Sequence, residues 1–249
     1  MKRILLITLI LFSISLASTL NVAVSANVSY AIDELKSEFI KQHSDAKLSI
    51  IIGSSAKLAS QIMHGAPYDI YMSANMDYPH KLYTQKLALD KPVVYAKGLL
   101  IYFSTKPQDY SKGMQLLQQD SLSKIAIANP KTAPYGKIAR DALQNAGVYE
   151  SVKQKLVYGE SIAQTFSYAL RAVDIALLSK SVLSSKQLQG YLQGIHYEDV
   201  SRSLYEPIPQ GIVILKRAKY NDDAKDFYRF VLSTKGQKIL KRYGYLVHE

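Results

Sequence analysis

Four short segments rich in Ser, Asn and Gly hold the groups best suited to chemistry in this sequence. They are Ser25-Ala26-Asn27, Gly53-Ser54-Ser55, Ala133-Pro134-Tyr135-Gly136 and Glu160-Ser161-Ile162, and each stands just before a run with helical spacing of apolar residues. Such segments offer hydroxyl groups, an amide and the free backbone N–H groups of helix N-termini, which favour bound anions without any Lys or Arg. If the four segments meet in space, they predict a site for a small anion.

A single segment of this kind is more often an ordinary helix cap than a ligand site, because Ser, Asn and Gly are preferred at helix N-termini. Four of them, split between two parts of the chain, favour the binding interpretation. Donors alone suit an anion that is fully deprotonated at neutral pH, whereas hydrogen phosphate also needs an acceptor for its proton. Asp69 and Glu160 are the nearest acidic candidates. If neither reaches the ligand, a fully deprotonated dianion is favoured over phosphate.

Alternating strands and helices are expected to position these segments. Apolar runs predict buried strands at 20–24, 48–52, 68–72, 98–104, 124–128, 155–158, 174–178 and 212–215. Between them apolar residues recur every three or four positions, as Ile32, Leu35 and Phe39 do, which is typical of helices. The alternation predicts an α/β fold whose sheets are mixed, mainly parallel and flanked by helices. Ligands bind beyond the carboxyl ends of the strands in such sheets, where the four segments lie.

Two lobes describe the expected fold better than one large domain, since compact domains cluster at roughly 100 to 200 residues and the chain has 249. The expected units are a signal peptide at 1–17, lobe 1 at 18–97 and 209–249, and lobe 2 at 98–208. We expect a Pro-containing linker at 205–211 and one amphipathic helix near the end of the chain that carries Phe227, Phe230, Val231 and Leu240. Two crossings between the lobes predict a hinge, with the ligand site in the cleft.

The first 17 residues have the layout of a secretory signal. Lys2 and Arg3 precede an apolar run at 4–12, and Ser15-Leu16-Ala17 places small residues at the outer positions of a cleavage site. The apolar run is well short of the roughly 20 residues that span a bilayer. We therefore expect cleavage near Ala17 and an exported chain, without the Cys that a lipid anchor requires.

Composition excludes several classes of protein. With no Cys, 48% hydrophobic and 20% charged residues, the chain is neither a disulfide scaffold nor wholly disordered. The formal net charge of +11 could attract nucleic acid, but the basic residues are spread along the chain and follow no nucleic-acid module. We therefore expect no nucleic-acid partner.

The chain resembles the periplasmic molybdate-binding proteins of ABC transporters, the ModA family of type 2 periplasmic binding proteins. The motifs that carry the resemblance are Val24-Ser25-Ala26-Asn27, Gly53-Ser54-Ser55, the run from Gly65 to Asn75, Ala133-Pro134-Tyr135-Gly136, Tyr205-Glu206-Pro207-Ile208 and Arg242-Tyr243-Gly244-Tyr245. The run from Gly65 is the most distinctive, and it ends on Ala74-Asn75 where the family usually has Ala-Asp. The resemblance covers essentially the whole mature chain.

The resemblance implies a two-lobed protein that closes on a molybdate or tungstate dianion. The dianion would be held through its oxygens by neutral donors, with no protein ligand on the metal and no cofactor. Carried over by position, Asn27 would supply its side-chain amide and N–H, Ser55 its hydroxyl and N–H, and Tyr135 and Ile162 their backbone N–H groups, with Ala26 as a further member of the first segment. Some members donate a Tyr hydroxyl where this chain has Leu177, which cannot donate from its side chain.

The same resemblance implies a monomer in the periplasm that serves the separate permease and ATPase of an importer. Sulfate has the same charge as molybdate but shorter bonds, so donors fixed on helix ends would bond to it poorly, at roughly 1 to 3 kcal/mol for each underused group. Molybdate and tungstate are nearly the same size, and the sequence does not separate them. Another tetrahedral oxyanion, such as sulfate or phosphate, is the alternative ligand.

Two other classes of function compete with the binding protein. An enzyme would need a nucleophile with its base, or a metal cluster, but the five His residues are scattered and no Gly-x-Ser-x-Gly, phosphate-loop or His-Glu-x-x-His motif is present. We therefore expect no enzymatic activity. A protein that only binds other proteins could do so through a surface rich in its 19 Tyr residues, which occur here without any Trp. Tyr more often packs its ring against the core and exposes its hydroxyl to solvent.

Overall fold

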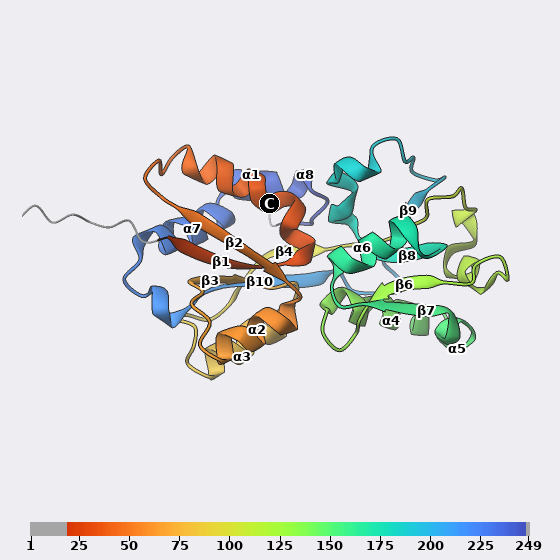
Figure 1. Ribbon diagram of the computed structural model, residues 1–249, viewed down its shortest axis with the longest axis horizontal. Helices are drawn as coiled ribbons and strands as arrows, with labels where there is room; N and C mark the ends of the chain where they lie inside the picture. The colour runs from red at the N-terminus through yellow and green to blue at the C-terminus, as the bar shows by residue number, and fades with distance from the viewer. Residues whose placement is uncertain (1–18, 248–249) are drawn as a thin grey trace, which may run out of the picture.

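Two five-stranded sheets, each flanked by helices, form two lobes in the computed structural model of this chain, which describes residues 19–247 (Figure 1). The lobes lie side by side along the longest axis of the molecule. The signal peptide expected at 1–17 lies outside the described residues.

The lobe 1 sheet has the strand order β2-β1-β3-β10-β4. Its strands are β1 (Leu20–Ser25), β2 (Leu48–Gly53), β3 (Ile70–Met72), β4 (Val93–Gly98) and β10 (Ile208–Ile214). β1 pairs in parallel with β2 and β3, and β10 runs antiparallel to β3 and β4, so one strand opposes the other four. The sheet is therefore mixed and mainly parallel, as the sequence predicts.

Helices cover both faces of this sheet. Successive residues of a strand point to opposite sides, and on both sides of this sheet they are apolar and buried. They are α1 (Ser29–Ile40), α2 (Ser55–Met63), α3 (Asp77–Thr84), α7 (Asp222–Leu232) and α8 (Thr234–Arg242). Val22 and Val24 of β1 belong to the apolar cluster under α1, α7 and α8, whereas Ala23 between them belongs to the cluster under α2 and α3. Two buried faces explain why β1 reads as a continuous apolar run.

The lobe 2 sheet has the order β7-β6-β8-β5-β9. Its strands are β5 (Leu100–Phe103), β6 (Ile125–Ala128), β7 (Leu156–Gly159), β8 (Ile175–Ser179) and β9 (Tyr197–Asp199). Here β5 runs against the other four strands. The α-helices of this lobe are α4 (Pro134–Asn145), α5 (Tyr149–Val152) and α6 (Ile162–Arg171). Segments of 3₁₀ helix occur in both lobes, at Ala26–Val28, Tyr110–Gln118, Lys153–Lys155, Lys180–Ser184, Lys186–Leu188 and Lys216–Ala218.

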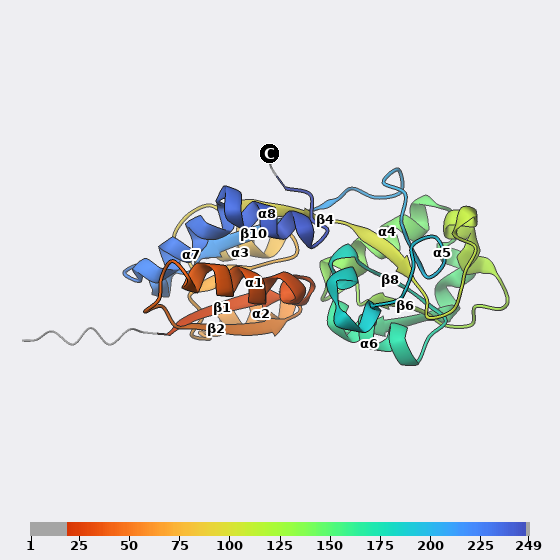
Figure 2. The same cartoon turned by 90° about the horizontal axis from the view of Figure 1, so that it is seen from above.

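The chain crosses between the lobes twice, from β4 into β5 and from β9 into β10, and Figure 2 shows both crossings from above. The predicted division into 18–97 with 209–249 and 98–208 remains a prediction. The linker expected at 205–211 is wrong in part, because β10 already begins at Ile208 and includes Pro209. Pro209 is tolerated because its partner Lys97 exchanges backbone hydrogen bonds with Leu246 instead.

Two further elements differ from the expectation. The strand expected at 98–104 is two strands, since β4 ends at Gly98 in one sheet and β5 begins at Leu100 in the other. The single terminal helix is in fact α7 and α8, which break at Ser233. The Ser233 hydroxyl accepts the N–H of Gly236 at 3.3 Å and so begins α8 with its own N-cap.

Candidate functional site

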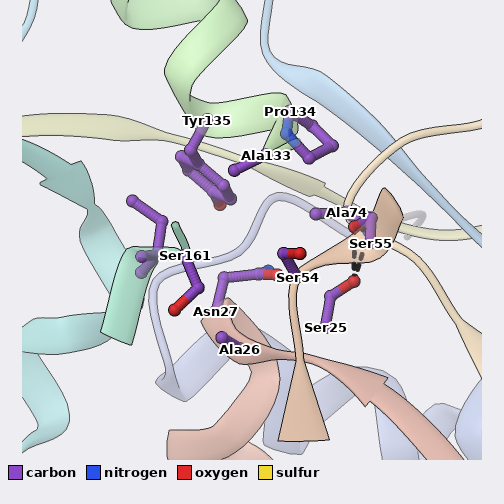
Figure 3. Close-up of a pocket in the computed structure, with 11 residues that line it drawn as sticks. Ser25, Ala26, Asn27, Ser54, Ser55, Ala74, Ala133, Pro134, Tyr135 and Ser161 are labelled. Atoms are coloured by element: carbon purple, nitrogen blue, oxygen red, sulfur yellow. Dashed lines mark hydrogen bonds between the residues drawn. The ribbon is translucent and has the colours of Figure 1, made fainter. Parts of the chain in front are cut away.

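A cavity between the two lobes collects the segments that the sequence analysis singled out (Figure 3). Its lining residues are Ser25, Ala26, Asn27, Ser54, Ser55, Ala74, Ala133, Pro134, Tyr135, Ser161 and Ile162. The empty volume between them is about 210 Å³, which includes space open to solvent. All five predicted site residues, Ala26, Asn27, Ser55, Tyr135 and Ile162, are thus brought together at the carboxyl ends of β1, β2, β6 and β7.

Two serine hydroxyls form the lobe 1 wall. The Oγ atoms of Ser25, at the end of β1, and Ser55, at the start of α2, lie 2.5 Å apart. The backbone N–H of Ala74 donates to both oxygens at 3.1 Å. Two hydroxyls carry two protons, and one of these is used between them, so the other is free to donate to a ligand.

The N-termini of three helices, α2 from lobe 1 and α4 and α6 from lobe 2, line the cavity. Ser55 begins α2 and Ile162 begins α6, whereas the first N–H of α4 belongs to Tyr135 because Pro134 has none. The first N–H groups of a helix have no intrahelical acceptor. In the described part of the chain neither Ser54 nor Ala133, the N-cap residues of α2 and α4, forms a side-chain cap. The N–H of Ala56, the second in α2, already donates to the carbonyl oxygen of Thr132 at 3.3 Å, so the donors available to a ligand are the N–H groups of Ser55, Tyr135 and Ile162.

Close packing at Gly136 sets the position of the α4 N-terminus. A Cβ atom at Gly136 would lie 2.1 Å from the carbonyl oxygen of Ala128, the last residue of β6. Glycine therefore lets the first turn of α4 rest directly on the end of the strand. The start of α6 is fixed differently, by the Ser161 hydroxyl that accepts the N–H of Gln164 at 3.3 Å.

Asn27 is held from three directions. Its Nδ2 donates to Gln210 Oε1 at 2.8 Å and to the Tyr245 hydroxyl at 2.9 Å. Its carbonyl oxygen accepts the hydroxyl of Tyr245 at 2.8 Å and that of Ser181 in lobe 2 at 2.7 Å. Among the described residues, Asn27 Oδ1 has no hydrogen-bond partner although it is buried. The amide nitrogen expected to donate to a ligand is thus engaged by the protein.

The cavity is electrically neutral. No Lys, Arg, Asp or Glu of the described residues lines it. Asp69 lies at the opposite end of the sheet, where it accepts the N–H of Asn21 at 2.8 Å and pairs with Arg217 at 3.0 Å, and Glu160 is exposed. Burial holds the pKa of Tyr135 well above its usual value, so its hydroxyl stays protonated at neutral pH. No acidic side chain of the described residues lines the cavity to accept the proton of hydrogen phosphate, which favours a fully deprotonated anion.

Leu177 is fully buried on β8 opposite Tyr102 and lies outside the cavity lining. Ser25, Ala74 and Gln210 also belong to the region of the cavity, although the sequence alone predicts no role for them; Ser25 and Ala74 do stand in the motifs of the ModA family. A usable signal for Gln210 exists, because it is the one polar side chain in the otherwise apolar strand β10.

Among residues 19–247, no group of three or more His, Asp or Glu side chains is placed to hold a metal ion. No helix of the same residues is long and apolar enough to cross a membrane. Two α/β lobes joined by two crossings, with a cavity of neutral donors between them, define the class of two-lobed solute-binding proteins.

Comparison with known proteins agrees with this class. The family model for bacterial extracellular solute-binding proteins matches residues 20–246. The molybdate-binding protein ModA of Azotobacter vinelandii is 34% identical over 230 residues, which are 92% of this chain and 90% of that protein. ModA of Rhodobacter capsulatus is 30% identical over 226 residues, which are 90% and 86% of the two chains.

The solved structure of the periplasmic molybdate-binding protein of A. vinelandii superposes with a TM-score of 0.84 at 28% identity, covering 92% of this chain and all of that one. The chain therefore belongs to the bacterial extracellular solute-binding proteins and, within them, to the ModA family.

Proposed function

We propose that this protein captures molybdate or tungstate in the cavity between its lobes and delivers it to the permease and ATPase of an ABC importer. The observation that carries the proposal is a neutral cavity in which two hydroxyls and the N-termini of α2, α4 and α6 converge from both lobes. The two ModA relatives support the choice of ligand. No cofactor and no catalytic step form part of the proposal.

The proposed ligand set is the one expected from the sequence. Ser55 donates its hydroxyl and N–H, Asn27 its side-chain amide and N–H, and Tyr135 and Ile162 their N–H groups, with Ala26 beside Asn27. Ser25 joins them as the residue that orients the Ser55 hydroxyl. In this arrangement the Ser25 hydroxyl donates to Ser55 Oγ, which leaves the proton of Ser55 for the ligand. Helix dipoles at α2, α4 and α6 add favourable potential for a dianion.

Selectivity in this proposal has two sources. A smaller dianion such as sulfate leaves fixed donors underused, which costs roughly 1 to 3 kcal/mol for each buried group. Hydrogen phosphate brings a proton that needs an acceptor, and no carboxylate of the described residues lines the cavity. Tungstate should bind much as molybdate does, because the two are nearly the same size.

The proposal places the mature protein in the periplasm as a monomer, after removal of a signal peptide near Ala17. Membership of the extracellular solute-binding family supports export. Mass spectrometry of the mature N-terminus and light scattering of the purified protein test these two points.

Calorimetric titration of the purified, ligand-stripped protein with molybdate, tungstate, sulfate and phosphate tests the function. We expect one-to-one binding of the first two and little heat from the others. Ser55→Ala should weaken molybdate binding by about tenfold to about 100-fold, since a hydrogen bond to a charged partner is lost. Ser60→Ala, a half-buried position on the same helix, is the matched control and should bind normally. Silence toward both molybdate and tungstate would overturn the proposal.

A further inference from the structure

Gln210 occupies an unusual place for a polar side chain. It is fully buried on β10, next to the bulge that shifts the pairing with β4 between Gln210 and Gly211. A bulge redirects the side chains beside it. Here it accompanies a glutamine amide that lies among groups from both lobes, beside a proposed ligand residue.

The partners of this amide come from three parts of the fold. Gln210 Oε1 accepts Asn27 Nδ2 at 2.8 Å and the hydroxyl of Tyr95, on β4, at 2.8 Å. Gln210 Nε2 donates to the hydroxyl of Tyr135, on α4 of lobe 2, at 3.2 Å. Gln210 therefore links one proposed ligand residue of lobe 1 to one of lobe 2.

This hydrogen-bond order decides what Asn27 can offer a ligand. As long as Gln210 Oε1 faces Asn27, the nitrogen of Asn27 must face Gln210, and Oδ1 is the side-chain atom left without a partner. Figure 3 shows the Asn27 side chain directed toward the Ser54 side of the cavity. An unpartnered buried acceptor is costly, and an acceptor repels a fully deprotonated anion.

A second hydrogen-bond order, with donors and acceptors exchanged, fits the same positions of the non-hydrogen atoms. If both amides turn over by half a rotation, Gln210 Nε2 donates to Asn27 Oδ1 and to the Tyr95 oxygen, and the Tyr135 hydroxyl donates to Gln210 Oε1. The Tyr95 hydroxyl then donates to the carbonyl oxygen of Ser73, which lies 3.4 Å away. The hydroxyl of Tyr245 turns to Asn27 Oδ1, while Ser181 stays on the Asn27 carbonyl oxygen. Asn27 Nδ2 is now free to donate into the cavity.

We propose that Gln210 is a positioning residue whose amide turns over together with that of Asn27, so that Asn27 presents its nitrogen to a fully deprotonated oxyanion. The proposal rests on the proposed function, because it concerns how the same cavity recognises its ligand. A glutamine can serve both orders because its amide has a donor end and an acceptor end. A carboxylate or an apolar side chain at this position cannot serve both.

Gly98 supplies the space that the network needs. A Cβ atom at this position of β4 would lie 2.1 Å from the Tyr135 hydroxyl and 2.4 Å from Gln210 Nε2. The hydroxyl from lobe 2 can therefore reach Gln210 only because residue 98 carries no side chain. The contact also ties the network to the approach of the two lobes.

Gln210→Glu tests the proposal through its pH dependence. At about pH 9 the introduced carboxylate only accepts, so it holds Asn27 Nδ2 and should weaken molybdate binding at least about tenfold. Burial raises the pKa of such a carboxyl, so near about pH 6 it is protonated, donates to Asn27 Oδ1, and part of the affinity should return. The unaltered protein and Gln154→Glu, which adds the same charge at an exposed site, should show neither effect.

Gln210→Met separates the polarity of the side chain from its bulk. It should lose affinity at every pH, because neither order can form, while the melting temperature reports whether the protein folds. Unchanged molybdate binding by folded Gln210→Glu, or an equal loss at both pH values, would overturn the inference. If the unaltered protein binds neither molybdate nor tungstate, the proposed function itself is wrong.

Neutron diffraction from the molybdate complex of the unaltered, deuterated protein gives a second test that needs no variant. We expect Asn27 Nδ2 to face the oxyanion and Gln210 Nε2 to face Asn27 Oδ1. Nuclear density that keeps Nδ2 on Gln210 while molybdate is bound would contradict the proposal.

Discussion

Both walls of the cavity offer backbone N–H groups, but only the lobe 1 wall adds side-chain donors. Lobe 1 contributes side chains, with the hydroxyls of Ser25 and Ser55 and the amide of Asn27, and each is tied to other protein groups. Lobe 2 contributes chiefly the first N–H groups of α4 and α6, at Tyr135 and Ile162. Side-chain donors depend on residue type, whereas backbone donors depend on where a helix begins.

The difference predicts where substitutions should matter. On lobe 1 a change of residue type removes a donor directly. On lobe 2 the same donor survives most changes of side chain, and only a displacement of the helix removes it. Three substitutions and one pH series follow, from the largest expected effect to the smallest.

Gly136→Ala should have the largest effect, because it moves a helix on the lobe 2 wall. The added Cβ would overlap the Ala128 carbonyl, so we expect a loss of about 2 to about 3 kcal/mol in the free energy of unfolding together with weaker molybdate binding. Urea unfolding followed by circular dichroism and calorimetric titration measure the two. Gly53→Ala is the lobe 1 control, since its Cβ would meet the flexible side chain of Leu58 at 3.2 Å. Equal losses in both variants would remove the contrast.

Ser25→Ala should weaken molybdate binding by a smaller factor than Ser55→Ala. Ser25 acts through the Ser55 hydroxyl, and Ala74 N–H still bonds Ser55 after the change. We expect about threefold to about tenfold weaker binding by titration, in line with the loss of one neutral hydrogen bond. A loss as large as that of Ser55→Ala would show that Ser25 touches the ligand itself.

The affinity for molybdate should vary less than about threefold between about pH 6 and about pH 9, because hydroxyl, amide and backbone donors do not titrate there. Titration at several pH values would reveal a carboxylate that reaches the ligand by a steep dependence. Burial raises the pKa of Tyr95 and Tyr135 well above the usual value. The free energy of unfolding should therefore fall as the pH rises above about 10, where tyrosines of the unfolded chain ionise and these two do not.

Ile162→Val should have the smallest effect. It shortens a buried side chain at the start of α6 and leaves the N–H in place, so molybdate affinity should stay within about twofold. The matched comparison is Ser55→Ala across the cavity. If titration showed equal losses, the lobe 2 wall would depend on side chains as the lobe 1 wall does.

The residues that line the cavity are predictable from the sequence because they follow strands and begin helices. Ser25, Ser55 and Ile162 each stand where an apolar run gives way to helical spacing, and the position after a parallel strand is the same edge of the sheet in every βα unit. These local patterns were sufficient to predict which residues the fold brings together. Their roles as ligands remain a prediction.

Contacts between segments that are distant in the sequence could not be predicted from it. Gln210 meets Asn27 across 183 positions, and nothing in the composition of either neighbourhood indicates the pair. The start of β10 at Ile208 was missed for a related reason, because Pro209 argues against a strand unless its partner is already bonded to Leu246. The break at Ser233 could have been predicted, since Ser is a preferred N-cap.

The order of β10 in the lobe 1 sheet has a consequence for how the chain folds during and after synthesis. Lobe 2 draws its strands from one continuous stretch, 100–199, whereas lobe 1 cannot place β4 in its sheet until β10 fills the gap beside β3. Contacts between distant segments form slowly. We therefore expect lobe 2 to fold first. A chain that lacks its last residues also loses Tyr245, whose hydroxyl donates to the carbonyl oxygen of Asn27, and should have no competent ligand site.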